Sequence, residues 1–239
     1  MSTLTLVRHG QASLFAEDYD RLSELGERQA AALGEYWART RTAFERVYSG
    51  PAKRHLRTAE LVGEICRKAG LAWPEPVVLP DLDEFPGEAL TRRYLPRVAV
   101  ANSRIGALER DLRAAQGQPG HARAIELLFR AFTTMWVRAE FDASQVETWQ
   151  MFESRVRRGL DQVRNHGAKG ARVVVFSSAG PTAIAVQMAH RLEPLQTLEL
   201  AWLVRNSAYS EFLFSGDRFS LLGFNAVPHL GDPALVTYR

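Results

Sequence analysis

Short apolar runs alternate with amphipathic segments along this chain. Leu4 to Val7, Val47 to Ser49 and Arg172 to Phe176 each end abruptly in polar or turn-forming residues, and each precedes a segment with helical spacing of apolar residues. Alternation of buried strands with helices predicts an α/β fold, in which a mainly parallel, open sheet is covered by helices on both faces.

The flanking segments refine this prediction. A helix is expected from Ser23, and the helix that follows Val47 to Ser49 is expected to end at Gly70. Two β-rich runs, Leu200 to Val204 and Tyr209 to Phe214, come late in the sequence, and a Ser-Gly-Asp turn leads from the second run into a further strand. Some antiparallel pairing is therefore expected at the C-terminal end of the sheet.

Residues 86–147 interrupt the alternation. Their apolar residues recur at helical spacing, and a Gly- and Pro-containing turn divides them. We predict a single domain over residues 1–239, with a helical insertion at about 86–147 that covers the strand ends and shapes the entrance to a site.

The composition excludes several classes of protein. The 239 residues are 46% hydrophobic and 24% charged, which excludes a disordered or fibrous chain. The net charge is +3 and the pI is about 9.2, but Lys occurs only at positions 53, 68 and 169, so almost all of the 30 basic residues are Arg. With no Lys-rich stripe or aromatic-interleaved basic patch, nucleic-acid binding is not predicted.

Compartment and cofactors follow from what the sequence lacks. The single cysteine, Cys66, cannot form an internal disulfide and is expected to be a buried thiol. No signal peptide or membrane-length apolar segment is recognised, so we expect a cytoplasmic protein without a membrane partner. No metal-ligand spacing is present, and neither a metal nor another cofactor is expected.

Polar residues follow the three apolar runs. In an open α/β sheet, ligands bind outside the carboxyl ends of the strands. Here these ends carry Arg8-His9-Gly10-Gln11, Ser49-Gly50-Pro51 with Arg54 beyond it, and Ser177-Ser178-Ala179-Gly180 at a helix N-terminus. Arginine forks, hydroxyls and helix-end amides suit a tetrahedral dianion, so the sequence predicts a phosphate site. His9 is then either a hydrogen-bond donor to phosphate or a nucleophile that attacks phosphorus.

The same segments resemble a known family. Leu-Val-Arg-His-Gly-Gln at 6–11, Leu-Ser-Glu-Leu-Gly-Glu-Arg-Gln-Ala at 22–30 and Val-Tyr-Ser-Gly-Pro-Ala-Lys-Arg-His-Leu-Arg-Thr-Ala at 47–59 are similar to the histidine phosphatase superfamily, also called phosphoglycerate mutase-like. The resemblance covers about residues 3–85 and 149–225. The helical insertion falls where family members vary.

The resemblance implies roles for individual residues. His9 would be phosphorylated on a ring nitrogen, with Arg8 and Arg54 binding the phosphoryl oxygens. Glu84 matches the acidic residue that protonates the leaving oxygen and then activates water, with Asp81 and Asp83 as close alternatives. The expected phosphate-binding set is Arg8, Gln11, Arg54, Ser178 and Ala179.

The chain departs from the family at the last of the three strand ends. Family members usually carry Ser-His-Gly-Gly there, and this chain has Ser178 where the second histidine is expected. None of the remaining histidines replaces it in line. His55 is expected to point about 100° away from Arg54 on a helix, and the others are expected to be structural or solvated (His121, His166 and His190) or are unassigned (His229).

Two functional hypotheses follow. The favoured one is a phosphatase that hydrolyses a phosphomonoester through phosphorylated His9, with reduced or altered activity because of Ser178. The alternative is a catalytically inactive member of the family, a pseudoenzyme that binds a phosphorylated ligand. The expected partner is a phosphorylated small molecule or phosphate, a homodimer is left open, and a mutase is disfavoured because it needs both family histidines.

Overall fold

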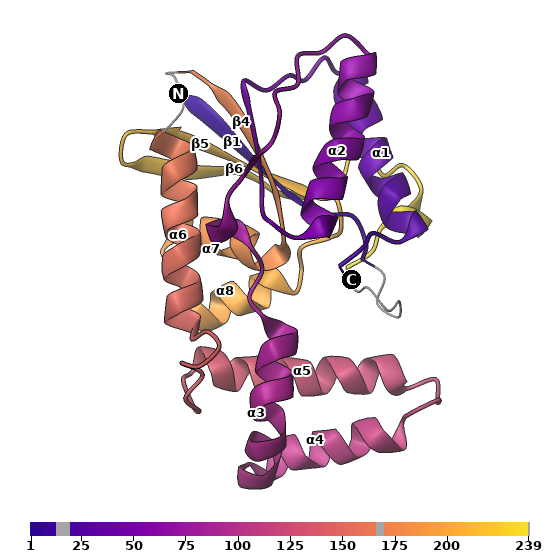
Figure 1. The fold of residues 1–239 in the computed structure, drawn as a ribbon, viewed down its shortest axis with the longest axis vertical. Coiled ribbons are helices and arrows are strands. Elements are labelled where there is room, and N and C mark those ends of the chain that lie inside the picture. Colours follow the sequence, from indigo (N-terminus) through magenta and orange to yellow (C-terminus); the bar gives the residue numbers. More distant parts are fainter. Residues whose placement is uncertain (13–19, 166–169, 239) are drawn as a thin grey trace. The chain divides into compact units, whose positions relative to one another are not determined.

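The computed structural model describes residues 1–12, 20–165 and 170–238 (Figure 1). The described strands are β1 (Ser2–Arg8), β2 (Arg46–Ser49), β3 (Val77–Val78), β4 (Arg172–Ser177), β5 (Tyr209–Ser215) and β6 (Arg218–Ala226). The described α-helices are α1 (Glu24–Arg39), α2 (Lys53–Lys68), α3 (Gly87–Ala101), α4 (Ser103–Ala114), α5 (His121–Val137), α6 (Trp149–Asn165), α7 (Ala179–His190) and α8 (Pro194–Ala201). The chain forms two compact units, one of Met1–Glu84 with Arg155–Arg239 and one of Phe85–Ser154.

The first unit contains the sheet, whose strand order is β3-β2-β4-β1-β5-β6. The pairs β2/β3, β2/β4 and β1/β4 are parallel, and β1/β5 and β5/β6 are antiparallel. This arrangement confirms the predicted mainly parallel sheet with antiparallel pairing at the C-terminal end. It also makes β2, β4 and β1 neighbours, so their carboxyl ends lie side by side.

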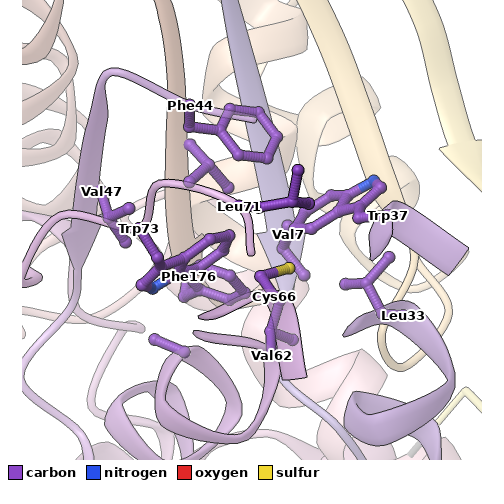
Figure 2. Close-up of a cluster of buried hydrophobic side chains, with 12 residues drawn as sticks. Val7, Leu33, Trp37, Phe44, Val47, Val62, Cys66, Leu71, Trp73 and Phe176 are labelled. Carbon is purple, nitrogen blue, oxygen red and sulfur yellow. The ribbon is translucent and has the colours of Figure 1, made fainter. Parts of the chain in front are cut away.

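Helices α1 and α2 cover one face of the sheet. A buried cluster on this face joins side chains of the strands to side chains of both helices (Figure 2); it includes Val7, Val174, Phe176, Leu33, Trp37, Val62 and Cys66. Successive strand residues point to opposite faces, so the buried Leu6, Val173 and Val175 belong to the other face. There α7 contacts β1 and β6. Cys66 is buried, as predicted, and burial raises its thiol pKa to about 11.

Local sequence explains where two helices begin. Ser23 is the N-cap of α1, as predicted, and its side chain accepts a hydrogen bond from the Gly26 amide. The prediction of a strand at Leu200 to Val204 is wrong, because α8 occupies the beginning of that run. The reason is a capping box in which Glu193 and Gln196 satisfy each other's backbone amides, with Pro at the first helical position.

The second unit is helical, and its helices α3, α4 and α5 are all contained in it. Its core is aromatic: Tyr94 and Phe132 both pack against Phe141, and Trp136 packs against Trp149. The indole of Trp136 donates to the Glu147 carbonyl at 2.8 Å. Of the described residues, no helix is both long and apolar enough to cross a membrane.

Candidate active site

The loops after β1, β2 and β4 are joined by backbone hydrogen bonds. The His9 amide donates to the Ser177 carbonyl at 2.9 Å, and the Gly50 amide donates to the Phe176 carbonyl at 2.8 Å. The three predicted strand ends therefore meet at one edge of the sheet. His9 is buried there, with 6% of its surface exposed.

Hydrogen bonds assign the tautomer of His9. Its Nδ1 lies 2.6 Å from the Gly10 carbonyl oxygen, which can only accept, so Nδ1 carries the proton. The Nε of Arg54 donates to Nε2 of His9 at 3.3 Å. Nε2 is therefore the unprotonated nitrogen, and its lone pair faces the arginine.

The surroundings of His9 keep it uncharged. Burial, and then the positive charges of Arg8 and Arg54, hold the pKa of His9 well below its usual range. A neutral imidazole at pH 7 has the lone pair that a nucleophile needs. The electrostatics and the hydrogen bonds thus agree on the state of this residue.

The backbone of His9 is held from two directions. Its carbonyl accepts from the Ser207 amide at 3.1 Å and from the Asn206 side chain at 3.4 Å. The Gly10 amide donates to Oγ1 of Thr58, on α2, at 3.2 Å. These hydrogen bonds restrain the backbone of the loop that carries the imidazole.

The two predicted phosphate arginines differ in their contacts. Arg54 is largely buried, and its Nη1 pairs with Asp20 at 2.6 Å, beside the Nε that reaches His9. Arg8 instead directs Nη1 to the backbone carbonyls of Val204 and Tyr238, the second at 2.7 Å. Arg54 therefore contacts His9 directly, whereas Nη1 of Arg8 binds backbone carbonyls of two later segments.

Geometry distinguishes Glu84 from the neighbouring aspartates. The Oε2 of Glu84 accepts from the Gly180 amide, in the first turn of α7, at 3.1 Å. Asp81 pairs with Arg158 at 3.2 Å, and Asp83 accepts from the Glu84 amide at 2.8 Å. Of the three carboxylates, Glu84 has the contact to the strand end that carries Ser178.

Arg155 clamps the acidic loop and was not identified from the sequence. Its guanidinium donates to the carbonyls of Asp81, Asp83 and Glu84 at 3.1, 2.8 and 3.0 Å. Three carbonyls on one cation fix the loop that presents Glu84. Nothing in the spacing of α6 separates this arginine from the others on the same helix.

His55, which the sequence analysis did not include among the site residues, lies beside Ser178. It is fully buried, its Nε2 lies 2.6 Å from Oγ of Ser178, and its ring centroid is 5.5 Å from that of His9. The signal was available, since His55 falls on the same helical stripe as the buried Thr58, Ala59 and Val62. That stripe predicts burial under α2, and the position at the helix start predicts nearness to the strand ends.

The remaining predicted residues have structural contacts. The Gln11 amide donates to Gln29 at 2.8 Å, and its side-chain oxygen accepts from Ser23 at 2.9 Å. Ala179 is the first residue of α7, where helix amides point out of the helix end.

Besides His9 and His55, three histidines lie within the described residues and one lies outside them. His190 is exposed at the last position of α7, and His121 begins α5 in the second unit. His229 is buried with Nε2 2.9 Å from Oγ of Ser207, and His166 is outside the described residues. Over the described ranges, no three or more His, Cys, Asp or Glu side chains form a group that could hold a metal ion.

Comparison with known proteins places this geometry in context. The family model described as histidine phosphatase superfamily (branch 1) matches residues 4–95 and 105–227. No curated protein sequence matches the chain.

Solved structures share its fold. A phosphoglycerate mutase from Bacillus anthracis has a TM-score of 0.62 at 19% identity, covering 96% of this chain and 95% of its own. A putative α-ribazole-5'-P phosphatase from Escherichia coli has a TM-score of 0.60 at 16% identity, covering 95% and 99%. A mycobacterial glucosyl-3-phosphoglycerate phosphatase in complex with inorganic phosphate has a TM-score of 0.60 at 21% identity, covering 95% and 98%.

Proposed function

Because the chain belongs to the histidine phosphatase superfamily (branch 1), we propose that it hydrolyses phosphomonoesters through a phosphohistidine formed on His9. The observation that carries this proposal is the neutral, buried imidazole whose Nε2 lone pair faces Arg54. The Gly10 carbonyl accepts from Nδ1, so the nitrogen that keeps its lone pair is Nε2. Here the second nitrogen lies at the meeting point of three strand ends.

The reaction proceeds in two displacements. In the first, the lone pair of His9 Nε2 forms a bond to phosphorus, the phosphorus–oxygen ester bond breaks, and the leaving oxygen takes a proton from the Glu84 carboxyl group. In the second, water gives a proton back to Glu84 and attacks phosphorus, and the phosphorus–nitrogen bond breaks. Inorganic phosphate leaves, and both residues return to their starting states.

The charges around His9 suit the phosphoryl group. Arg54 lies beside Nε2, and the first turn of α7 adds amide donors and the positive end of a helix dipole. Arg8 is the last residue of β1, next to His9, and its positive charge helps to lower the pKa of His9. In this proposal Arg8, Arg54, Ser178 and the Ala179 amide bind the phosphoryl oxygens, and Gln11 shapes the loop beside them.

A second candidate is binding of a phosphorylated ligand without turnover. It is favoured by Ser178, which stands where relatives are expected to carry a second histidine. Removing one donor to the transition state typically lowers the rate about 10²- to 10³-fold. A slow phosphatase and a binding protein thus differ only in the rate of hydrolysis, and a measurement of turnover distinguishes them.

The test measures steady-state hydrolysis of an aryl phosphate by the wild-type protein and by His9→Ala. We expect activity in the wild type only, and an acid-labile phosphoryl group on the wild type after rapid quenching. Equal background rates in both proteins would overturn the phosphatase proposal. Calorimetric binding of inorganic phosphate without turnover would then support the binding function.

A further inference from the structure

His55 and Ser178 form a buried pair across the candidate site. His55 lies in the first turn of α2, and Ser178 is the N-cap of α7, so 122 residues of sequence separate the two along the chain. Their side chains nevertheless meet at 2.6 Å, and they are 0% and 1% exposed. Such a short contact between sealed polar groups is a specific feature of this site.

Hydrogen bonding assigns the direction of this contact. Within the described residues, Nδ1 of His55 is buried and has no hydrogen-bond partner. An unpaired buried N–H is more costly than an unpaired buried acceptor. The proton therefore lies on Nε2, which donates to Ser178 Oγ, and the Ser178 hydroxyl hydrogen can be donated to a third group.

The backbone around His55 accommodates an imidazole. A Cβ atom on Gly50 would lie 2.5 Å from Nδ1 of His55 and 2.8 Å from the Leu82 carbonyl oxygen. The strand end after β2 therefore has room for the ring only because residue 50 has no side chain. The glycine of the Ser-Gly-Pro turn therefore leaves the space that the His55 ring occupies.

The pair lies close to His9. In the register of β1 and β4, Arg8 pairs with Ser177, and the next residues along the two strands are His9 and Ser178. The rings of His55 and His9 are 5.5 Å apart between centroids. Ser178 and His55 therefore both lie close to His9.

We propose that His55 and Ser178 together supply the donor of the absent second histidine: His55 donates to Ser178, and the Ser178 hydroxyl donates to a phosphoryl oxygen in the transition state. This proposal rests on the phosphatase function above. Chained hydrogen bonds polarise one another, so a serine held by a histidine is a stronger donor than a serine alone. Ser178 is the residue that touches the substrate, and His55 is a positioning residue that acts through it.

The experiment compares kcat for an aryl phosphate in Ser178→Ala, His55→Ala and the double variant His55→Ala/Ser178→Ala. We expect each single variant to lose about 10²-fold in kcat. The double variant should lose little more than either single one, because the two residues act as a unit. If the fold-losses of the two single variants multiply in the double variant, the two residues act independently and the proposal is wrong.

A swap of the two side chains is the sharpest variant. His55→Ala/Ser178→His moves the imidazole from α2 to the strand end, into the position of the family's second histidine. We expect its kcat to be at least about tenfold higher than that of His55→Ala. No recovery, in a swap variant that unfolds at the wild-type temperature, would contradict the proposal.

A purely structural role for His55 needs its own control. Val62→Ala removes buried apolar surface from the same helix at a position in the core of Figure 2. It should lower stability by a comparable amount and leave kcat unchanged. His55→Gln, which keeps a side-chain N–H, should retain more activity than His55→Ala.

Vanadate binding separates failure of this proposal from failure of the proposed function. Vanadate mimics the trigonal-bipyramidal transition state, and inorganic phosphate mimics the ground state. His55→Ala should weaken vanadate binding about tenfold or more and phosphate binding less. If the wild type is inactive, the phosphatase proposal is wrong. If the wild type is active and His55→Ala changes neither the vanadate affinity nor kcat, only the proposal for His55 and Ser178 is wrong.

Discussion

Three of the histidines in this protein are buried and uncharged. His9 and His55 both have pKa values held well below the usual range, mainly by burial. Burial also lowers the pKa of His229 to about 4. In the folded protein all three therefore stay unprotonated at pH values just below 6.5, where the histidines of the unfolded chain become protonated.

The sign of the resulting pH dependence is fixed. As pH falls from about 6.5 toward the folded-state pKa, the unfolded state gains protons that the native state does not. The stabilising contribution is complete above pH 6.5 and is lost on acidification. For His229, the interval from 6.5 to about 4 corresponds to a loss on the order of 3 kcal/mol.

His229→Gln should flatten this dependence. Urea unfolding at about pH 7 and about pH 4.5 would show a smaller drop in the free energy of unfolding for the variant than for the wild type, because Gln has no proton to gain. His190→Gln is the control, since His190 is exposed. A drop of wild-type size in His229→Gln would show that His229 is not protected from protonation.

Single residues also mark how far sequence reasoning reached. His9, Arg54 and Glu84 were predicted as one site, and the structure brings His9 to Arg54 and Glu84 to α7. From the sequence, the direction of His55 was considered only relative to Arg54 on the helix. The face of α2 that packs against the sheet was not considered. Its partner is 123 positions away, and no local pattern encodes that contact.

Among the larger elements, the loop after β1 and the start of α1 approach each other unusually closely. A Cβ on Gly10 would lie 2.3 Å from the Gly26 carbonyl oxygen, and one on Gly26 would lie 2.1 Å from the Gln11 carbonyl oxygen. Both obstacles are backbone atoms, which cannot rotate away. Glycine at these two positions lets α1 press the loop that carries His9 against the sheet.

Gly26→Ala should therefore damage both stability and the site. We expect destabilisation of about 1–3 kcal/mol from overpacking, with a fall in phosphatase rate because the His9 loop must move. Thermal unfolding and kcat would be measured together. Gly223→Ala, where a Cβ would meet nothing within 4 Å, should change neither, and a stable, fully active Gly26→Ala would refute the close approach.

Elements were predicted best where their signals are local. The strands before His9 and Ser178 were found from apolar runs, and the start of α1 was found from Ser23. The run at 200–204 was read as a strand from its apolar residues, although the capping residues Glu193 and Gln196 announce a helix. The strand order cannot be predicted from such local signals, because strand pairing depends on contacts between segments that are distant in the sequence.

On the scale of the whole molecule, the C-terminal segment braces the backbone of His9. Thr237 exchanges hydrogen bonds with Asn206, at 2.8 Å between backbone groups and 2.9 Å between side chains. Asn206 in turn donates to the His9 carbonyl. Gln29 reaches Leu235 and Thr237, and Arg8 reaches Tyr238.

Removing the residues after Val236 should weaken this brace. We expect a loss of about 4 kcal/mol in unfolding free energy, about 1 kcal/mol for each of the four hydrogen bonds described above. We also expect a fall in kcat because His9 loses support through Asn206. Tyr238→Ala is the matched control, since it keeps the backbone carbonyl that Arg8 binds. A truncated protein with wild-type kcat would show that the segment does not support the site.

The contact between Arg8 and Tyr238 joins residues 230 positions apart. During synthesis, the strand that carries Arg8 leaves the ribosome long before its partner carbonyl exists. The emerging chain can form the early strand and helices, but the brace behind His9 closes only after residue 238 has been added. A nascent chain that does not yet include residue 238 therefore lacks the backbone carbonyl that Arg8 binds.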